Sequence, residues 1–294
     1  MPILADMDKS VIIQGKPLHY RVVGKGSPVL LLHGFGEDSR IWDTMEATLA
    51  ENWKLILPDI PGSGKSEAWD GNELDEEGSS APSLDDYAEA MKQVLDAEGI
   101  GTCTMIGHSM GGYITLAFAE KYPEWLDGFG LFHSTADPDG PEKKEARRKG
   151  MAFMTEHGAE RFLRQSIPNL FGETFRLDHP AEVVKLLTRG NEFTAKTLRQ
   201  YYRAMIQRPD RKGVLKNSKV PVLFVIGDED KTVNLQDVLC QSHLPSIAHV
   251  LVWQGVAHMG MREVPQLSME ALMKFLRHAK GHPIEQATPP HPRS

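Results

Sequence analysis

The stretch TCTMIGHSMGG at positions 102–112 decides the fold of this chain. An apolar run typical of a buried strand, residues 102–106, leads directly into Gly107-His108-Ser109-Met110-Gly111, and a helical pattern begins at Met110. A G-x-S-x-G pattern alone is weak, but here it stands between a strand and a helix, as a nucleophile turn requires. The small residues two positions either side of Ser109 relieve crowding in such a turn. The stretch therefore predicts a strand–turn–helix unit that raises the Ser109 hydroxyl above a sheet edge.

Strands and helices alternate on both sides of this turn. The segments expected to be strands are 10–14 and 18–23 (joined by a turn at Gly15-Lys16-Pro17), 28–32, 54–57, 102–106, 128–132, 220–226 and 249–253. Helical patterns cover 83–98, 110–121, 235–242 and 264–279, and Ser83 followed by Asp86 predicts a capped helix start. This alternation predicts an α/β fold: a mostly parallel central sheet with helices on both faces.

Residues 135–215 interrupt the alternation. They contain no convincing strand, and their helical stretches are 141–156, 159–166, 180–190 and 194–207. We therefore predict a core formed by residues 1–134 and 216–280, with a helical cap inserted at 135–215. Residues 281–294 are Pro-rich and predict a disordered tail, while the acidic segment 67–82 predicts a solvated loop.

Composition excludes several classes of protein. Of 294 residues, 40% are hydrophobic and 25% charged, which is near the globular average and unlike a disordered chain, a collagen or a coiled coil. No apolar run approaches the roughly 20 residues of a membrane span, and the N-terminal stretch lacks the apolar core of a signal peptide. A net charge of −7 argues against bulk binding of nucleic acid or anionic lipid. Cys103 and Cys240, both expected to be buried, form no disulfide framework, so we expect a cytoplasmic protein.

A serine hydroxyl needs a base, and the base needs an acid to orient it. His258 follows the run 249–253, and Asp230 follows 222–226, so both come just after a strand, as Ser109 does. Because the carboxyl ends of parallel strands share one edge, the three side chains should meet there. Asp137, after the strand at 128–132, and Asp228, which is better placed to brace its loop, remain alternative acids. The chain order Ser109, Asp230, His258 is that of the G-x-S-x-G scaffold.

An acyl-transfer site also needs donors for an oxyanion. His33-Gly34-Phe35-Gly36 follows the strand at 28–32, and its glycines let the Phe35 N–H turn toward a substrate oxygen. The N–H of Met110, directly after Ser109, is the second predicted donor.

These motifs together resemble the α/β-hydrolase-fold superfamily with a helical cap. The resemblance spans residues 10–279 and rests on the segments 33–36, 57–66, 107–112, 227–230 and 255–258. In detail the chain is similar to small bacterial carboxylesterases, enol-lactonases and cofactor-free perhydrolases. The resemblance implies a Ser109/Asp230/His258 triad, Phe35 and Met110 as oxyanion donors, and a structural turn at 59–66. One departure is that members often carry a proline a few residues after the acid, where this chain has Lys231-Thr232-Val233-Asn234.

We therefore expect hydrolysis of a carboxylic ester or lactone through an acyl-enzyme, with a small-molecule substrate and without a metal or organic cofactor. A serine at position 109 counts against the aspartate-dependent epoxide hydrolases and haloalkane dehalogenases. A C–C bond hydrolase and a slow-turnover ligand receptor or signalling protein are the alternatives. Residues expected to form an apolar pocket for a medium-sized acyl or alkyl group are Phe35, Met110, His133, Met259, Met151, Phe153, Met154, Phe162 and Phe171.

Two other patterns favour different functions only weakly. The segment Gly62-Ser63-Gly64-Lys65-Ser66 resembles a phosphate-binding loop, but Asp59 occupies the place of its first glycine. His33, His108 and His258 have no zinc-site spacing, and no cysteine or acid pair completes such a set.

Overall fold

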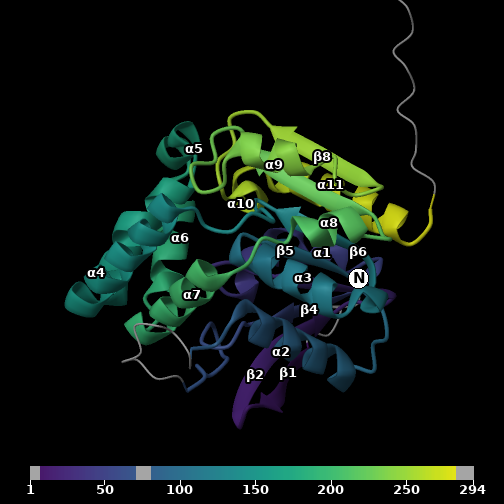
Figure 1. Cartoon of the computed structure of the whole chain (residues 1–294), viewed down its shortest axis with the longest axis horizontal. Helices are drawn as coiled ribbons and strands as arrows, with labels where there is room; N and C mark the ends of the chain where they lie inside the picture. The colour runs from purple at the N-terminus through teal and green to yellow at the C-terminus, as the bar shows by residue number, and fades with distance from the viewer. Residues whose placement is uncertain (1–6, 71–80, 283–294) are drawn as a thin grey trace, which may run out of the picture.

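A computed structural model describes residues 7–70 and 81–282 of the chain. Within these ranges, eight strands form one sheet in the order β1-β2-β4-β3-β5-β6-β7-β8. The strands are β1 (Met7–Ile13), β2 (Lys16–Val23), β3 (Ser27–Leu32), β4 (Trp53–Pro58), β5 (Cys103–His108), β6 (Leu126–Phe132), β7 (Val222–Gly227) and β8 (Ala248–Trp253). β2 pairs antiparallel with β1 and with β4, and all other neighbours are parallel. The predicted mostly parallel sheet is confirmed (Figure 1).

The first hairpin turns one residue earlier than predicted. Gln14 and Gly15 form the turn, with φ of 51° and 75°, and β2 already begins at Lys16. Two consecutive positive φ values match the twist of the paired strands, which is the geometry that two-residue hairpins favour. The expected Gly15–Pro17 turn is therefore wrong, because Lys16 and Pro17 belong to the strand.

Helices pack against the sheet between the strands. Their bounds are α1 (Asp43–Leu49), α2 (Leu84–Ala97), α3 (Met110–Lys121), α8 (Lys212–Asn217), α9 (Leu235–Gln241), α10 (Gly260–Glu263) and α11 (Pro265–Ala279). The predicted cap of α2 is confirmed, since Ser83 and Asp86 exchange side-chain to backbone hydrogen bonds. The short helices α1, α8 and α5 (Glu173–Asp178) were not predicted, because six or seven residues are too few to show a helical period.

The residues between β6 and β7 are helical, as expected. They form α4 (Pro141–Ser166), the 3-10 turn η3 (Ile167–Leu170), α5 (Glu173–Asp178), α6 (Pro180–Gly190) and α7 (Ala195–Gln207), which gather on the left in Figure 1. The predicted break between 156 and 159 is a kink within α4, where Gly158 takes a φ of 84°. The chain leaves the sheet directly after β6, at the edge where β5 ends before Ser109. The bounds 135–215 of a separate helical cap stay a prediction.

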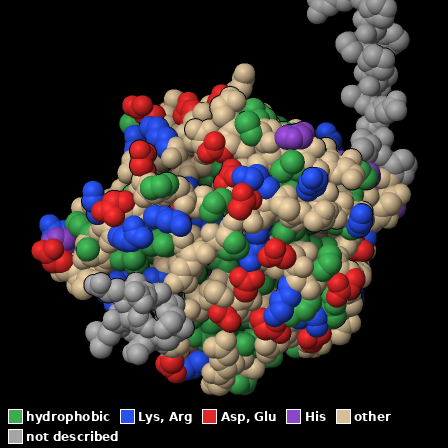
Figure 2. Space-filling view, viewed as in Figure 1, with side chains coloured by type: hydrophobic (Ala, Val, Ile, Leu, Met, Phe, Trp, Pro, Cys, Tyr) green, Lys and Arg blue, Asp and Glu red, His purple; other side chains and the backbone are tan. Residues whose placement is uncertain are grey.

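Burial and charge follow the expected pattern with one exception. β3 and β5 lie in the interior of the sheet and are almost entirely buried, whereas the outer strand β8 exposes Val250 and Val252. Cys103 is buried, but Cys240 is exposed on the outer side of α9, so its predicted burial is wrong. Acidic and basic side chains are interspersed over the face shown in Figure 2. No helix in the described ranges is long and apolar enough to cross a membrane. Most of the predicted acidic loop (71–80) and of the predicted tail (283–294) lies outside the described residues.

Candidate active site

The turn between β5 and α3 holds Ser109 in a strained backbone conformation. Ser109 has φ 50° and ψ −114°, values that a non-glycine residue rarely adopts. Its N–H donates to the Phe132 carbonyl (3.0 Å), and its carbonyl accepts from the Ser134 hydroxyl (2.7 Å). The turn is so tight that a β-carbon at Gly107 would lie 2.2 Å from the Gly111 carbonyl carbon. This is the geometry that the glycines of the motif predict.

His258 and Asp230 meet at the same sheet edge. His258 Nδ1 lies 2.8 Å from Asp230 Oδ2, and both side chains are buried. The other carboxylate oxygen, Oδ1, accepts from the backbone N–H groups of Thr232 (2.8 Å) and Val233 (2.9 Å). Burial raises the pKa of Asp230, but His258 and His133 outweigh burial and hold the pKa far below its usual range. The acid is therefore ionised, as a group that orients an imidazole must be.

The missing proline after the acid has a physical explanation in these contacts. Thr232 and Val233 each supply a backbone N–H to Asp230, and a proline at either position would remove that donor.

The two alternative acids have other partners. Asp137 accepts from Lys212 Nζ and from Gln241 Nε2, each at 2.5 Å. Asp228 accepts from the Gly255 N–H (2.8 Å) and braces its loop. Of the three candidate acids, Asp230 is the one whose contacts within the described chain include His258.

A second histidine contacts the same acid. His133, at the end of β6, lies with Nδ1 3.2 Å from Asp230 Oδ2, is fully buried and has a φ of 49°. Burial lowers its pKa to about 4, so the ring is neutral at neutral pH and Nδ1 carries the donated hydrogen. Sequence reasoning assigned His133 to a pocket wall, whereas it lies against the acid.

The loop after β3 packs directly against Ser109. A β-carbon at Gly34 would lie 3.1 Å from Ser109 Cβ, and no described residue accepts a hydrogen bond from the Phe35 N–H. The Met110 N–H is in the first turn of α3, where no intrahelical acceptor exists. Within the described residues, the N–H groups of Phe35 and Met110 are therefore both without a backbone acceptor, and both lie close to Ser109.

Glu37 and His108 tie this loop to the histidine segment. Glu37 Oε2 accepts from the Gly34 N–H (2.8 Å) and lies 2.9 Å from His108 Nδ1, while His108 Nε2 lies 2.9 Å from the His258 carbonyl. Burial raises the pKa of Glu37 and lowers that of His108, but each group's attraction for the other outweighs burial and favours the charged forms. Because a carboxylate and a carbonyl only accept, His108 donates from both nitrogens and is an imidazolium.

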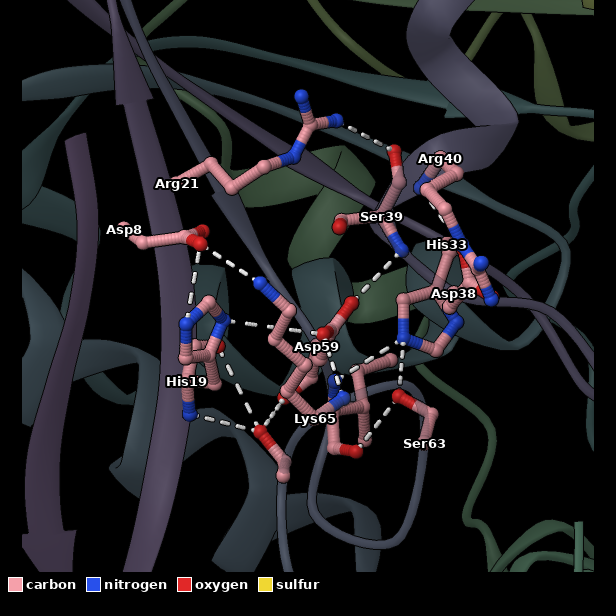
Figure 3. A network of polar contacts seen from close by, with 12 residues as sticks. Asp8, His19, Arg21, His33, Asp38, Ser39, Arg40, Asp59, Ser63 and Lys65 are labelled. Carbon is pink, nitrogen blue, oxygen red and sulfur yellow. Dashed lines mark hydrogen bonds and ion pairs between the residues drawn. The ribbon is translucent and has the colours of Figure 1, made fainter. Parts of the chain in front are cut away.

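His33 and the turn 59–66 support the same loop from behind (Figure 3). His33 Nε2 accepts from the Ile60 N–H (2.9 Å), and its Nδ1 therefore donates to the Gly34 carbonyl (2.9 Å). Asp59 accepts from the N–H groups of Ser39 and Lys65, each at 2.9 Å, so the turn folds around its own aspartate. The N–H groups of Ser63, Lys65 and Ser66 in this turn already donate within the protein, so they are not available to a phosphate.

A cavity of about 300 Å³ opens onto the serine and the histidine. It is lined by Phe35, Glu37, Ser109, Tyr113, Arg147, Leu163, Ser166, Ile167, Asn169, Leu170, Tyr202, Met205, Lys231, Thr232 and His258. Of the residues expected to form its apolar wall, only Phe35 lines it. Met154 and Phe171 are buried in the packing of the insertion, and the Phe162 ring packs edge-on against Tyr202 instead.

One group in the described chain has metal-ligand character. Donor atoms of His133, Asp230 and His258 lie within 4.8 Å of one another. Both imidazoles already direct a nitrogen at the same carboxylate oxygen, so the cluster is accounted for by hydrogen bonds.

Comparison with known proteins agrees with this fold. Residues 27–261 match the family model of the alpha/beta hydrolase fold, and the chain belongs to this family. Lipase 1 of Psychrobacter immobilis is 27% identical over 259 residues, covering 81% of this chain and 73% of the lipase. A malate-bound thermophilic esterase from Thermogutta terrifontis has the same fold, with a TM-score of 0.85, 25% identity, and coverage of 93% of this chain and 99% of the esterase.

Some curated relatives are much longer than the matched part. An uncharacterized protein of Mycobacterium tuberculosis is 31% identical over 115 residues, and the alignment spans 39% of this chain and 31% of that protein.

The predicted fold class and the predicted resemblance to bacterial esterases are confirmed.

Proposed function

We propose that the protein is a serine hydrolase that cleaves a small carboxylic ester or lactone through an acyl-enzyme. The observation that carries the proposal is the Asp230–His258 hydrogen bond of 2.8 Å beside a cavity that also exposes Ser109. The names of the lipase and esterase relatives support an ester as the scissile group. The two free cysteines support a reducing, cytoplasmic location.

In the proposed mechanism, His258 takes the proton of the Ser109 hydroxyl as its oxygen attacks the substrate carbonyl. The N–H groups of Phe35 and Met110 stabilise the oxyanion, and such donors are each typically worth about 3–4 kcal/mol. His258 then protonates the leaving alcohol. It next activates a water molecule, which attacks the acyl-enzyme and releases the carboxylic acid product. Asp230 keeps the imidazole in the required tautomer and stabilises its charged form.

Three contacts hold His258 in place for these steps. The backbone N–H of His258 donates to the Leu170 carbonyl of the insertion (2.9 Å), and its backbone carbonyl accepts from the His108 imidazolium. Glu263 binds the N–H groups of both neighbours, Ala257 and Met259. The base is thus fixed from the core and from the insertion together.

A covalent probe tests the proposal. A fluorescent organophosphonate should add one label at Ser109, identified by peptide mass spectrometry, and abolish hydrolysis of 4-nitrophenyl butyrate. Ser109→Ala should not react, whereas Ser166→Ala, which removes another hydroxyl from the cavity wall, should still be labelled. Labelling at any other serine would overturn the assignment. Slow hydrolysis across an ester panel, with fast cleavage of a vinylogous diketone, would favour the C–C hydrolase instead.

A further inference from the structure

A largely buried guanidinium, that of Arg147, lines the cavity. Arg147 of α4 has a side chain only 11% exposed, and it reaches the same cavity as Ser109 and His258. Its Nε and Nη2 donate to the two carboxylate oxygens of Asp139 (2.6 and 3.4 Å), and its guanidinium lies over the Tyr202 ring, 5.0 Å from the centroid. A guanidinium with five N–H donors is not satisfied by these contacts, so it retains capacity for a ligand.

The charges around Arg147 do not cancel. Asp139 is fully buried and also pairs with Arg208 (2.9 Å), with Lys143 Nζ at 3.9 Å, so one carboxylate faces three cations. Lys231 adds a further cation to the cavity lining. The carboxylate that lines the cavity, Glu37, is already paired with the His108 imidazolium. Among the largely buried groups, two guanidiniums therefore share one carboxylate, and a buried excess charge is costly unless an opposite charge meets it.

The hydroxyl of Tyr113 lies in the positive electrostatic potential of the same cations. It lines the cavity from α3, and the Arg208 guanidinium lies 3.9 Å from its ring centroid. Burial raises the pKa of Tyr113, but Arg208, Lys143 and Arg147 more than offset burial and lower the pKa below its ordinary value. The surroundings of this hydroxyl thus favour negative charge, and no described residue accepts its hydrogen bond.

We propose that the substrate carries a carboxylate in addition to its scissile ester, bound by Arg147 and the Tyr113 hydroxyl. A planar carboxylate matches the guanidinium fork, and charge-assisted hydrogen bonds of this kind are strong in a desolvated site. With a volume of about 300 Å³, the cavity favours a small molecule, such as a monoester of a short dicarboxylic acid. This inference rests on the proposed function for the scissile bond, and it replaces the apolar substrate that the sequence suggested.

The test compares two esters of similar length, neutral 4-nitrophenyl butyrate and anionic mono-4-nitrophenyl glutarate. The wild-type protein should prefer the anionic ester in kcat/KM. Arg147→Met should lower kcat/KM for the anionic ester about 10- to 100-fold, the loss expected of charge-assisted hydrogen bonds, and change the neutral ester less than about 3-fold. Arg147→Lys should fall between the two, because it keeps the charge and loses the fork.

Arg148→Met is the matched control. It removes the same charge from the next position of α4, but Arg148 pairs with Glu145 on the surface and does not line the cavity. The preference for the anionic ester should be unchanged in this variant. Equal losses on both esters in Arg147→Met, or an equal effect of Arg148→Met, would overturn the carboxylate subsite.

A binding measurement separates this inference from the proposed reaction. Glutarate should bind Ser109→Ala in calorimetry and should inhibit the wild-type protein competitively, whereas uncharged glutaramide should do neither. If neither ester is hydrolysed but glutarate binds through Arg147, the reaction is wrong and the subsite stands. If neutral esters are hydrolysed and glutarate does not bind, the subsite is wrong and the reaction stands. Should Arg147→Met fail to fold, the wild-type preference and the glutarate–glutaramide comparison decide the matter.

Discussion

Two buried carboxylates, Asp230 and Asp139, each contact a residue that lines the cavity, yet their surroundings differ. Asp230 accepts from two imidazoles and two backbone N–H groups, whereas Asp139 is surrounded by the guanidiniums of Arg147 and Arg208. In both, these partners outweigh burial and lower the pKa. An imidazole exchanges a proton near neutral pH and a guanidinium does not. The comparison teaches that a buried, ionised acid indicates proton transfer only when its partner can titrate.

The largest expected effect is the loss of activity when Asp230, the acid that contacts imidazoles, is changed. Asp230→Asn should lower kcat by about 10⁴, because the amide favours the wrong tautomer of His258 while the geometry is kept. Steady-state kinetics on 4-nitrophenyl butyrate measure this. Asp137→Asn, at the alternative acid, should retain activity within about 3-fold. The reverse result would place the acid after β6.

The second effect is on stability and concerns Asp139, the acid that contacts guanidiniums. Asp139→Asn leaves the Arg147 and Arg208 guanidiniums buried without their counter-ion, which should cost about 3–5 kcal/mol of unfolding free energy in urea titrations. On a neutral ester, kcat per folded molecule should change far less than in Asp230→Asn. Asp237→Asn, on the exposed first turn of α9, is a control for loss of one carboxylate and should change stability by less than about 1 kcal/mol. Unaltered stability in Asp139→Asn would show that the cation cluster is not held by this acid.

The third effect is the pH dependence of the unfolding free energy that His133, a titratable partner of Asp230, should cause. His133 has a pKa of about 4 when folded, below the roughly 6.5 of an unfolded histidine, so the unfolded chain binds this proton first as the pH falls. The contribution of neutral His133 to the free energy of unfolding is complete above about pH 6.5 and is lost as the pH falls to about 4. This lowers the free energy of unfolding by about 3 kcal/mol. In His133→Asn this part of the pH dependence of the unfolding free energy should disappear. A wild-type curve that is flat between pH 6.5 and 4 would contradict the assignment.

The smallest effect tests whether His133 tunes the base through the acid. The groups around this histidine are Asp230, His258 and His108. Removing its N–H in His133→Leu should make Asp230 a stronger acceptor for the His258 ring and move the acid limb of kcat/KM to higher pH. His133→Asn supplies an N–H at a similar place and tolerates positive φ, so the limb should stay in place. Identical profiles for the Leu and Asn variants would leave His133 a packing residue.

Much of the fold and of the proposed triad could be predicted from the sequence. The β5–Ser109–α3 unit depends on neighbouring residues, since glycines at 107 and 111 and an adjoining apolar run are local features. Asp230 and His258 could be placed because parallel strands end at one edge, which converts a position in the sequence into a position in space. The hairpin turn was missed by one residue because turn type depends on how the strands pair.

The sequence by itself therefore determined the order of the elements, the turn that holds Ser109, and the positions of Asp230 and His258 directly after their strands. Only the tertiary structure decided that Glu37 pairs with His108, that His133 shares Asp230 with His258, and that Arg147 lines the cavity in place of the Met and Phe side chains of the insertion that were predicted to do so. These contacts join residues 71 and 97 positions apart, or depend on how the insertion packs against the sheet edge. No local period or motif encodes such a contact, because the partner is chosen by packing after the elements have formed.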